Sequence, residues 1–116
     1  MEQLTVDHTV RTRLLDAGVD PSEIASHGRS VHGLTAFLGR PTPDSRADIS
    51  SVSLLNGDRM LLCSDGVHRQ IRPHRLQALL SEGTCRQAAA ALVDAADRSG
   101  GADNATAVVV EVGMVS

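Results

Sequence analysis

A short apolar run bounded by turn residues on both sides constrains the fold of this chain more than any other feature. The run, Met-Leu-Leu-Cys, covers residues 60–63. Asn56-Gly-Asp58 precedes it and Ser64-Asp-Gly66 ends it, and both are sequences that reverse a chain. Consecutive apolar residues are typical of a strand buried on both faces. Because residues 49–55 partly alternate between apolar and polar before the first turn, the sequence predicts a hairpin of strands 49–55 and 59–63.

Capping residues and helical spacing predict four helices. In the first, Asp7 or Thr9 is the cap and Gly18 ends the helix. Asp20 and Thr84 cap the second and the fourth. The four predicted helices span residues 7–17, 21–26, 73–81 and 85–99.

Two further strands are expected, over residues 34–38 and 106–112, the second of them rich in Val. Residues 27–33 are expected to be irregular, and the two prolines in residues 39–44 predict a loop. Helices and strands occur in groups instead of alternating, which favours an α+β fold in a chain of 116 residues, the size of one domain.

Composition excludes several classes of function. Phe37 is the only aromatic residue, so the core must be aliphatic and no aromatic platform is available for stacking bases. The net charge is −3 with the two signs mixed, so no nucleic-acid partner is expected. No apolar run reaches the ~20 residues of a membrane span, and a cytoplasmic protein is expected. Cys63 and Cys85 are expected to be reduced thiols.

Two carboxylates flank apolar strands. Asp65 directly follows the strand 59–63, and Asp103 shortly precedes the strand 106–112. If these strands are antiparallel neighbours, the two side chains meet at one edge of the sheet and could share a cation, because Mg²⁺ and Mn²⁺ prefer oxygen ligands. Taken singly, each segment is more typical of an ordinary glycine-containing turn than of a metal site.

Together and in this order, the segments resemble the type 2C (PPM) metal-dependent protein serine/threonine phosphatases of bacteria. That family has a strand ending in Ser-Asp-Gly, a helix rich in Ala and Leu, and then Gly-Gly-x-Asp-Asn-x-Thr before a final strand. The motifs that match here are Leu4-Thr-Val-Asp-His-Thr9, Leu34-Thr-Ala-Phe-Leu-Gly39, Asn56-Gly-Asp-Arg59, Leu62-Cys-Ser-Asp-Gly66, Gln87-Ala-Ala-Ala-Ala-Leu-Val93 and Gly100-Gly-Ala-Asp-Asn-Ala-Thr106. They cover nearly the whole chain.

The resemblance implies a fold, an activity and a cofactor. It implies the carboxy-terminal half of a four-layer αββα sandwich, with antiparallel sheets flanked by helices and the first half missing. It implies hydrolysis of phosphoserine and phosphothreonine with Mg²⁺ or Mn²⁺, for which Asp65 and Asp103 occupy two metal-ligand positions. Residues 18–43 resemble the family's flap. Within it, His27-Gly-Arg-Ser30 is similar to the family's His-Pro-x-Arg-Asn but is shifted and lacks the Pro, so His27, Arg29 and His32 are expected to be solvated loop residues. His68, Arg69 and His74 match no family ligand and are expected at the surface.

The departures from the family are as informative as the matches. The Gly-Asp-Gly-x-Gly-Gly motif, with its metal-bridging Asp, has no counterpart, and neither do the family's phosphate-binding Arg and its proposed general acid His. The isolated chain is therefore expected to be inactive, because a two-metal site needs more than two carboxylates. Two alternatives stay open: a non-catalytic fragment that binds a partner, and a half that needs a complementary amino-terminal half. The expected partners are a phosphoprotein substrate or that missing half.

Overall fold

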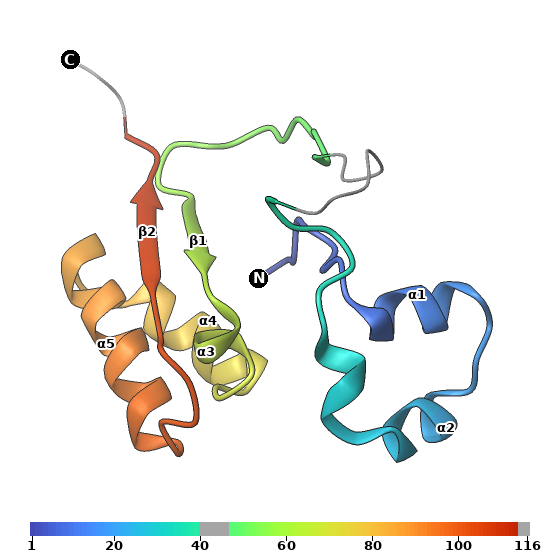
Figure 1. The fold of residues 1–116 in the computed structure, drawn as a ribbon. Helices are drawn as coiled ribbons and strands as arrows, with labels where there is room; N and C mark the ends of the chain where they lie inside the picture. The colour runs from blue at the N-terminus through green and yellow to red at the C-terminus, as the bar shows by residue number, and fades with distance from the viewer. Residues whose placement is uncertain (40–46, 114–116) are drawn as a thin grey trace. The chain divides into compact units, whose positions relative to one another are not determined.

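The protein, seen here in a computed structural model, divides into two compact units, Met1–Ser51 and Val52–Ser116 (Figure 1). The structure describes residues 1–39 and 47–113. Each unit has buried residues of its own, so each packs around its own small core.

The first unit contains two short α-helices and a 3₁₀-helix. They are α1 (Val10–Asp16), α2 (Pro21–Ser26) and η1 (Gly28–His32). Thr9 caps α1, because its hydroxyl accepts the backbone N–H of Thr12 at 3.2 Å. Asp20 caps α2 in the same way, accepting the N–H of Ser22 at 2.8 Å. Both predicted helices are therefore confirmed, and capping side chains explain where they begin.

Two other expectations in this unit were wrong. Residues 34–38 do not form a strand: Leu34 makes only an isolated antiparallel bridge to Thr9, and Leu38 is fully exposed. A strand needs a neighbour along its length, and Thr9 continues directly into α1 instead of extending the bridge. The stretch expected to be irregular, 27–33, forms η1. Apart from Gly39, the predicted loop 39–44 lies outside the described residues, as does the end of the flap-like segment 18–43.

The second unit is built on a two-stranded antiparallel sheet. Strand β1 (Arg59–Cys63) pairs with β2 (Ala107–Glu111), with Arg59 opposite Glu111 and Cys63 opposite Ala107. The predicted hairpin is therefore wrong, because β1 pairs with β2 and not with residues 49–55. The turn exists, since Asp58 donates its N–H to the carbonyl of Leu55 at 3.0 Å, but residues 49–55 form no strand. A turn sequence fixes a local reversal of the chain, whereas strand pairing depends on which segment completes the core.

Three helices cover one face of this sheet (Figure 1). They are α3 (Asp65–His68), α4 (Pro73–Ser81) and α5 (Cys85–Arg98). The predicted helices at 73–81 and 85–99 are thus confirmed. In α5 a capping box fixes the start: Thr84 accepts the N–H of Gln87, and the Gln87 side chain accepts the N–H of Thr84.

The core of the second unit is aliphatic, as the composition requires. Its buried members are Val67, Ile71, Leu76, Leu92, Ala95 and Ala96. From the sheet, Leu61, Cys63, Ala107 and Val109 pack against them. The opposite face of the sheet stays open: Leu62, Val108 and Val110 are 55%, 51% and 42% exposed. Cys63 and Cys85 are thiols, as expected, and half-buried.

Arg59 links the sheet to the helices. Its guanidinium bonds the Glu111 carboxylate across the strand pair, with Nε 3.0 Å from Oε1. It also donates to the carbonyls of Leu80, Glu82 and Gly83, where α4 ends. The last turn of a helix leaves carbonyls without intrahelical partners. A side chain that begins in β1 therefore satisfies the end of α4.

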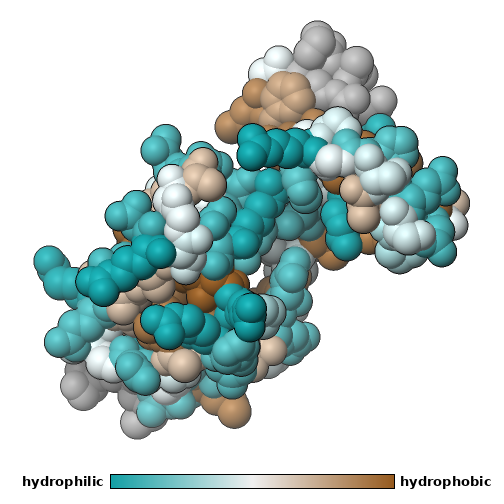
Figure 2. Space-filling view, turned by 90° about the horizontal axis from the view of Figure 1, so that it is seen from below, coloured by the Kyte–Doolittle hydropathy of each residue, from teal (hydrophilic) through white to brown (hydrophobic). Residues whose placement is uncertain are grey.

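The fold class is α+β, as predicted. Within residues 1–39 and 47–113 there is one sheet, of two strands, so the four-layer sandwich is not confirmed. None of the helices in these ranges is both long and apolar enough to cross a bilayer. Hydrophilic residues cover most of the face seen in Figure 2, with small apolar areas between them.

Candidate functional site

Strand pairing in the second unit brings the segments that contain Asp65 and Asp103 to the same end of the sheet. Cys63 at the end of β1 lies opposite Ala107 at the start of β2. Beyond this pair, Ser64 donates its N–H to the carbonyl of Thr106 at 3.0 Å, and its hydroxyl accepts the N–H of Thr106 at 3.0 Å. The antiparallel pairing that the sequence analysis had only assumed for these strands is therefore present.

Asp65 is the first residue of α3. Ser64 takes the cap position with extended backbone, so the chain turns directly from strand to helix. The Asp65 carboxylate lies 3.3 Å from the Arg69 guanidinium, one helical turn later, and both side chains are partly exposed. Arg69 had been expected only as a surface residue. The i, i+4 spacing of an acid and a base was the signal in the sequence for this ion pair.

Gly66 allows the two segments of the site to touch. A Cβ built on Gly66 would overlap the carbonyl oxygen of Asn104 and lie 2.8 Å from its carbonyl carbon. The close approach is the reason that a glycine is needed here, and not a left-handed backbone conformation, because the φ of Gly66 is not positive. The residue following Asp65 thus packs directly on the residue following Asp103.

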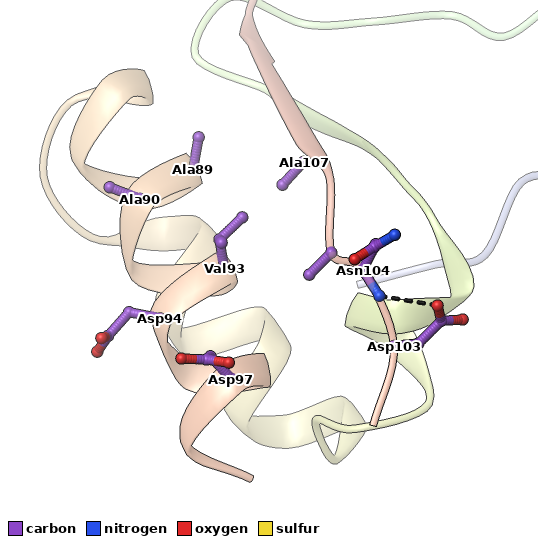
Figure 3. Close-up of a pocket in the computed structure, with 9 residues that line it drawn as sticks. Ala89, Ala90, Val93, Asp94, Asp97, Asp103, Asn104 and Ala107 are labelled. Atoms are coloured by element: carbon purple, nitrogen blue, oxygen red, sulfur yellow. Dashed lines mark hydrogen bonds between the residues drawn. The ribbon is translucent and has the colours of Figure 1, made fainter. Parts of the chain in front are cut away.

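Asp103 lies on the loop between α5 and β2, after Gly100 and Gly101, both of which have positive φ. Its carboxylate is exposed and accepts the N–H of Asn104 at 2.7 Å, the bond drawn in Figure 3. This local bond holds one carboxylate oxygen close to the backbone and leaves the second oxygen available to a ligand.

Asp103 also lies at one end of a groove beside α5, of about 720 Å³ (Figure 3). The lining residues are Ala89, Ala90, Val93, Asp94, Asp97, Asp103, Asn104, Ala105 and Ala107. Small apolar side chains line its middle, and three carboxylates lie toward the end of α5. Nothing in the sequence analysis had pointed to this groove.

The residues of the site do not make a complete metal centre by themselves. Asp65 and Asp103 have the oxygen donors that Mg²⁺ and Mn²⁺ prefer, but Arg69 already pairs with one of them. Within residues 1–39 and 47–113, no three His, Cys, Asp or Glu side chains are grouped so that they could hold an ion. A small divalent cation here would need further ligands from elsewhere.

The remaining candidates of the sequence analysis are surface residues. His68 and His74 are exposed on α3 and α4, as expected. His27, Arg29 and His32 are exposed around η1 in the first unit. Sequence reasoning missed one contact there: His8 Nε2 lies 2.7 Å from Asp48 Oδ2, beside a hollow of about 310 Å³. The two residues are 40 positions apart, so no local pattern could have paired them.

Curated relatives of this chain are bacterial phosphatases, although no protein-family model matches it. Serine/threonine protein phosphatase PstP of Mycobacterium tuberculosis is 33% identical over an alignment of 116 residues, which covers 97% of this chain and 21% of PstP. Protein phosphatase PhpP of Streptococcus pneumoniae is 31% identical over an alignment of 112 residues, which covers 95% of this chain and 45% of PhpP. The chain thus spans less than half the length of these relatives.

Solved structures agree with this relationship. The crystal structure of the PPM Ser-Thr phosphatase MsPP from Mycobacterium smegmatis, in complex with cacodylate, matches 97% of this chain with a TM-score of 0.79 and 33% identity. The S. agalactiae serine/threonine phosphatase matches 96% with a TM-score of 0.86 and 27% identity. The match covers 48% and 46% of those chains. The chain is therefore homologous to PPM-family serine/threonine phosphatases and corresponds to about half of such a protein, consistent with its carboxy-terminal half.

Proposed function

We propose that this chain forms part of a protein serine/threonine phosphatase, which hydrolyses phosphoserine and phosphothreonine at a site that depends on Mg²⁺ or Mn²⁺. Asp65 and Asp103 are its contribution to the metal ligands. PPM phosphatases are metal-dependent, and the chain is related to them over nearly its whole length. The observation that supports the proposal most is that Asp65 follows β1 and Asp103 shortly precedes β2, and the end of β1 pairs with the start of β2.

The residues around the carboxylates support this role. Ser64 and Thr106 join the two strand ends through their hydrogen bonds, and Gly66 packs on Asn104, so neither segment can shift without the other. A ligand pair held in this way loses little conformational freedom when it binds an ion. Arg69 neutralises Asp65, and a cation would take over that role.

When bound, the ions of such a site supply a nucleophilic water and neutralise phosphate charge. Asp65 and Asp103 can supply part of the shell of one small cation, whose remaining ligands can be waters and substrate oxygens, but they do not also supply the carboxylate that bridges it to a second ion. The catalytic site therefore needs residues that the isolated chain does not supply. The open face of the sheet, with Leu62, Val108 and Val110 exposed, is the kind of surface on which a complementary half would pack. The isolated chain is proposed to be inactive until that half is added.

The alternative is a phosphatase-like fragment without catalysis that binds a partner. The ion pair between Asp65 and Arg69 favours it, because a residue already neutralised by an arginine has less need of a metal. The phosphatase proposal and the partner-binding alternative are both argued from Asp65 and its surroundings, so activity and metal binding must be measured together.

The experiment measures Mn²⁺ binding by electron paramagnetic resonance and hydrolysis of a small aryl phosphate. The parent chain, Asp65→Asn and Asp103→Asn are compared, with Asp16→Asn as a matched control in the first unit. Each is assayed alone and with the segment of PhpP that this chain does not match. The proposal expects activity only in the mixture, lost in both site variants and kept in the control.

Two results would decide against the phosphatase proposal. Mixtures without turnover, combined with Mn²⁺ binding that is the same in Asp65→Asn and Asp103→Asn as in the parent, would leave the partner-binding fragment as the better account. Turnover by the parent chain alone would contradict the proposed incompleteness and show that this half builds a working site.

A further inference from the structure

The outer edge of β2 is unpaired within the part of the chain that the structure describes. β1 is its one neighbour in the sheet. Ser64 donates its N–H to the carbonyl of Thr106, and Val112 donates its N–H to the carbonyl of Asp58. Because backbone groups alternate in direction along a strand, the even-numbered residues from 106 to 112 direct their N–H and C=O groups toward β1. The N–H and C=O groups of Ala107, Val109 and Glu111 therefore point away from β1. An exposed row of this kind is a template for another strand.

The groove described above lies directly beside this edge. Ala105 and Ala107 line it from the strand side, while Ala89, Ala90 and Val93 line it from α5 (Figure 3). Because these side chains are small, a second helix could approach α5 closely while a second strand paired with β2. Adjacent strands lie about 4.8 Å apart and packed helices about 8–10 Å apart. If each α5 lies farther from the two-fold axis than β2 does, the spacing between the strands and the spacing between the helices can both be met.

The charges on this side of α5 form a self-complementary pattern. Arg86, Ala90 and Asp94 follow one another at four-residue spacing and are all exposed, so they form one stripe along the helix. The base is at one end, the acid at the other, and a small residue is at the centre. When the helix is placed antiparallel to a copy of itself about Ala90, Arg86 faces Asp94 at both ends. Asp94 already has a partner, Arg98 at 2.9 Å, but that pair is largely exposed and a carboxylate accepts more than one donor.

We propose that this chain forms a two-fold symmetric dimer through β2 and α5. β2 pairs antiparallel with β2 of a second copy about Val109, so the two sheets join into one of four strands. On the helix-covered face, α5 lies antiparallel to its copy, with two Arg86–Asp94 pairs. A two-fold interface requires that each residue and its contact appear twice, and a stripe with Arg and Asp equally distant from a small centre meets that requirement. The proposal does not rest on the proposed phosphatase function, because it uses neither Asp65 nor Asp103.

The test is sedimentation velocity of the full chain over a range of concentrations, at low salt. The parent is expected to dimerise. Arg86→Glu and Asp94→Arg each turn two attractions into repulsions and should raise Kd at least about tenfold. The double variant, Arg86→Glu with Asp94→Arg, should restore dimerisation. Arg75→Glu on α4 is the matched control, since Arg75 is exposed and lies outside the groove.

A second variant tests the strand edge separately. Ala107→Pro removes an N–H that points away from β1, at the first residue of β2, where proline is tolerated. It should yield a monomer with an unchanged circular dichroism spectrum. The proposal is overturned if the parent is a monomer at all concentrations. It is equally overturned if a dimer persists in both Arg86→Glu and Ala107→Pro, because the copies then meet on another surface.

Discussion

Replacing Gly66 with alanine tests whether the contact between the two halves of the site is as close as the structure shows. The new methyl group would overlap the carbonyl oxygen of Asn104 and lie 3.3 Å from Cα of Ala105. Both neighbours are backbone, so no side chain can rotate away. Overpacking of this kind costs roughly 1–3 kcal/mol, and an overlap with backbone lies at the upper end. Alanine recovers at most about 1 kcal/mol through its higher helix propensity.

The two effects leave a net loss of about 2 kcal/mol in the free energy of unfolding, or about 10 °C in Tm for a unit of this size. Urea denaturation followed by circular dichroism measures it. Gly113→Ala is the matched control, because a Cβ there meets nothing within 4 Å and its φ is not positive. Mn²⁺ binding should weaken in Gly66→Ala as well, since the Asn104 segment must move. A Gly66→Ala chain as stable as Gly113→Ala would refute the reasoning.

Three further predictions concern the core, a helix cap and a carboxyl group. Leu92→Ala should lower the free energy of unfolding by about 2–5 kcal/mol in urea denaturation, because Leu92 is fully buried, while Leu38→Ala at a fully exposed position should change little. Thr84→Ala should cost about 1 kcal/mol by removing the α5 cap, and Thr84→Ser, which keeps the hydroxyl, should recover most of it; equal losses in both would contradict the capping role. Hydrogen bonds from the Ser22 hydroxyl and backbone N–H lower the pKa of Asp20, so this cap stabilises the folded state above the unfolded pKa and the benefit is lost as the pH falls through the folded pKa. An NMR titration should find the pKa of Asp20 raised toward its ordinary value in Ser22→Ala, and an unchanged pKa would disprove that origin of the shift.

The helices α1, α2, α4 and α5 could be predicted from the sequence because local patterns mark their ends, whereas α3 and η1 were not predicted. Thr9, Asp20 and Thr84 each accept a backbone N–H two or three residues later, within reach of any reading of the sequence. The strands β1 and β2 could likewise be predicted from their consecutive apolar residues, but the expected burial on both faces was wrong, because Leu62, Val108 and Val110 are exposed on the open face.

What could not be predicted depends on distant segments. Residues 34–38 and 49–55 have strand-like patterns but no strand beside them along their length, and pattern alone does not supply a neighbour. In the candidate site, the position of Asp65 and Asp103 at the same end of the sheet could be predicted only by assuming that β1 and β2 are antiparallel neighbours. The contact of Gly66 with Asn104 and the groove beside α5 depend on three-dimensional packing that has no trace in the spacing of residues.

The position of Arg59 has a consequence for how the second unit comes apart. Because one guanidinium holds Glu111 of β2 together with the carbonyls of Leu80, Glu82 and Gly83, separating the strands also releases the end of α4. Separation of β1 from β2 alone is therefore unfavourable, because the end of α4 would lose its hydrogen bonds to Arg59 at the same moment as the sheet. Amide hydrogens of β1, β2 and the last turn of α4 should then exchange with solvent at one common rate, as members of a single opening event.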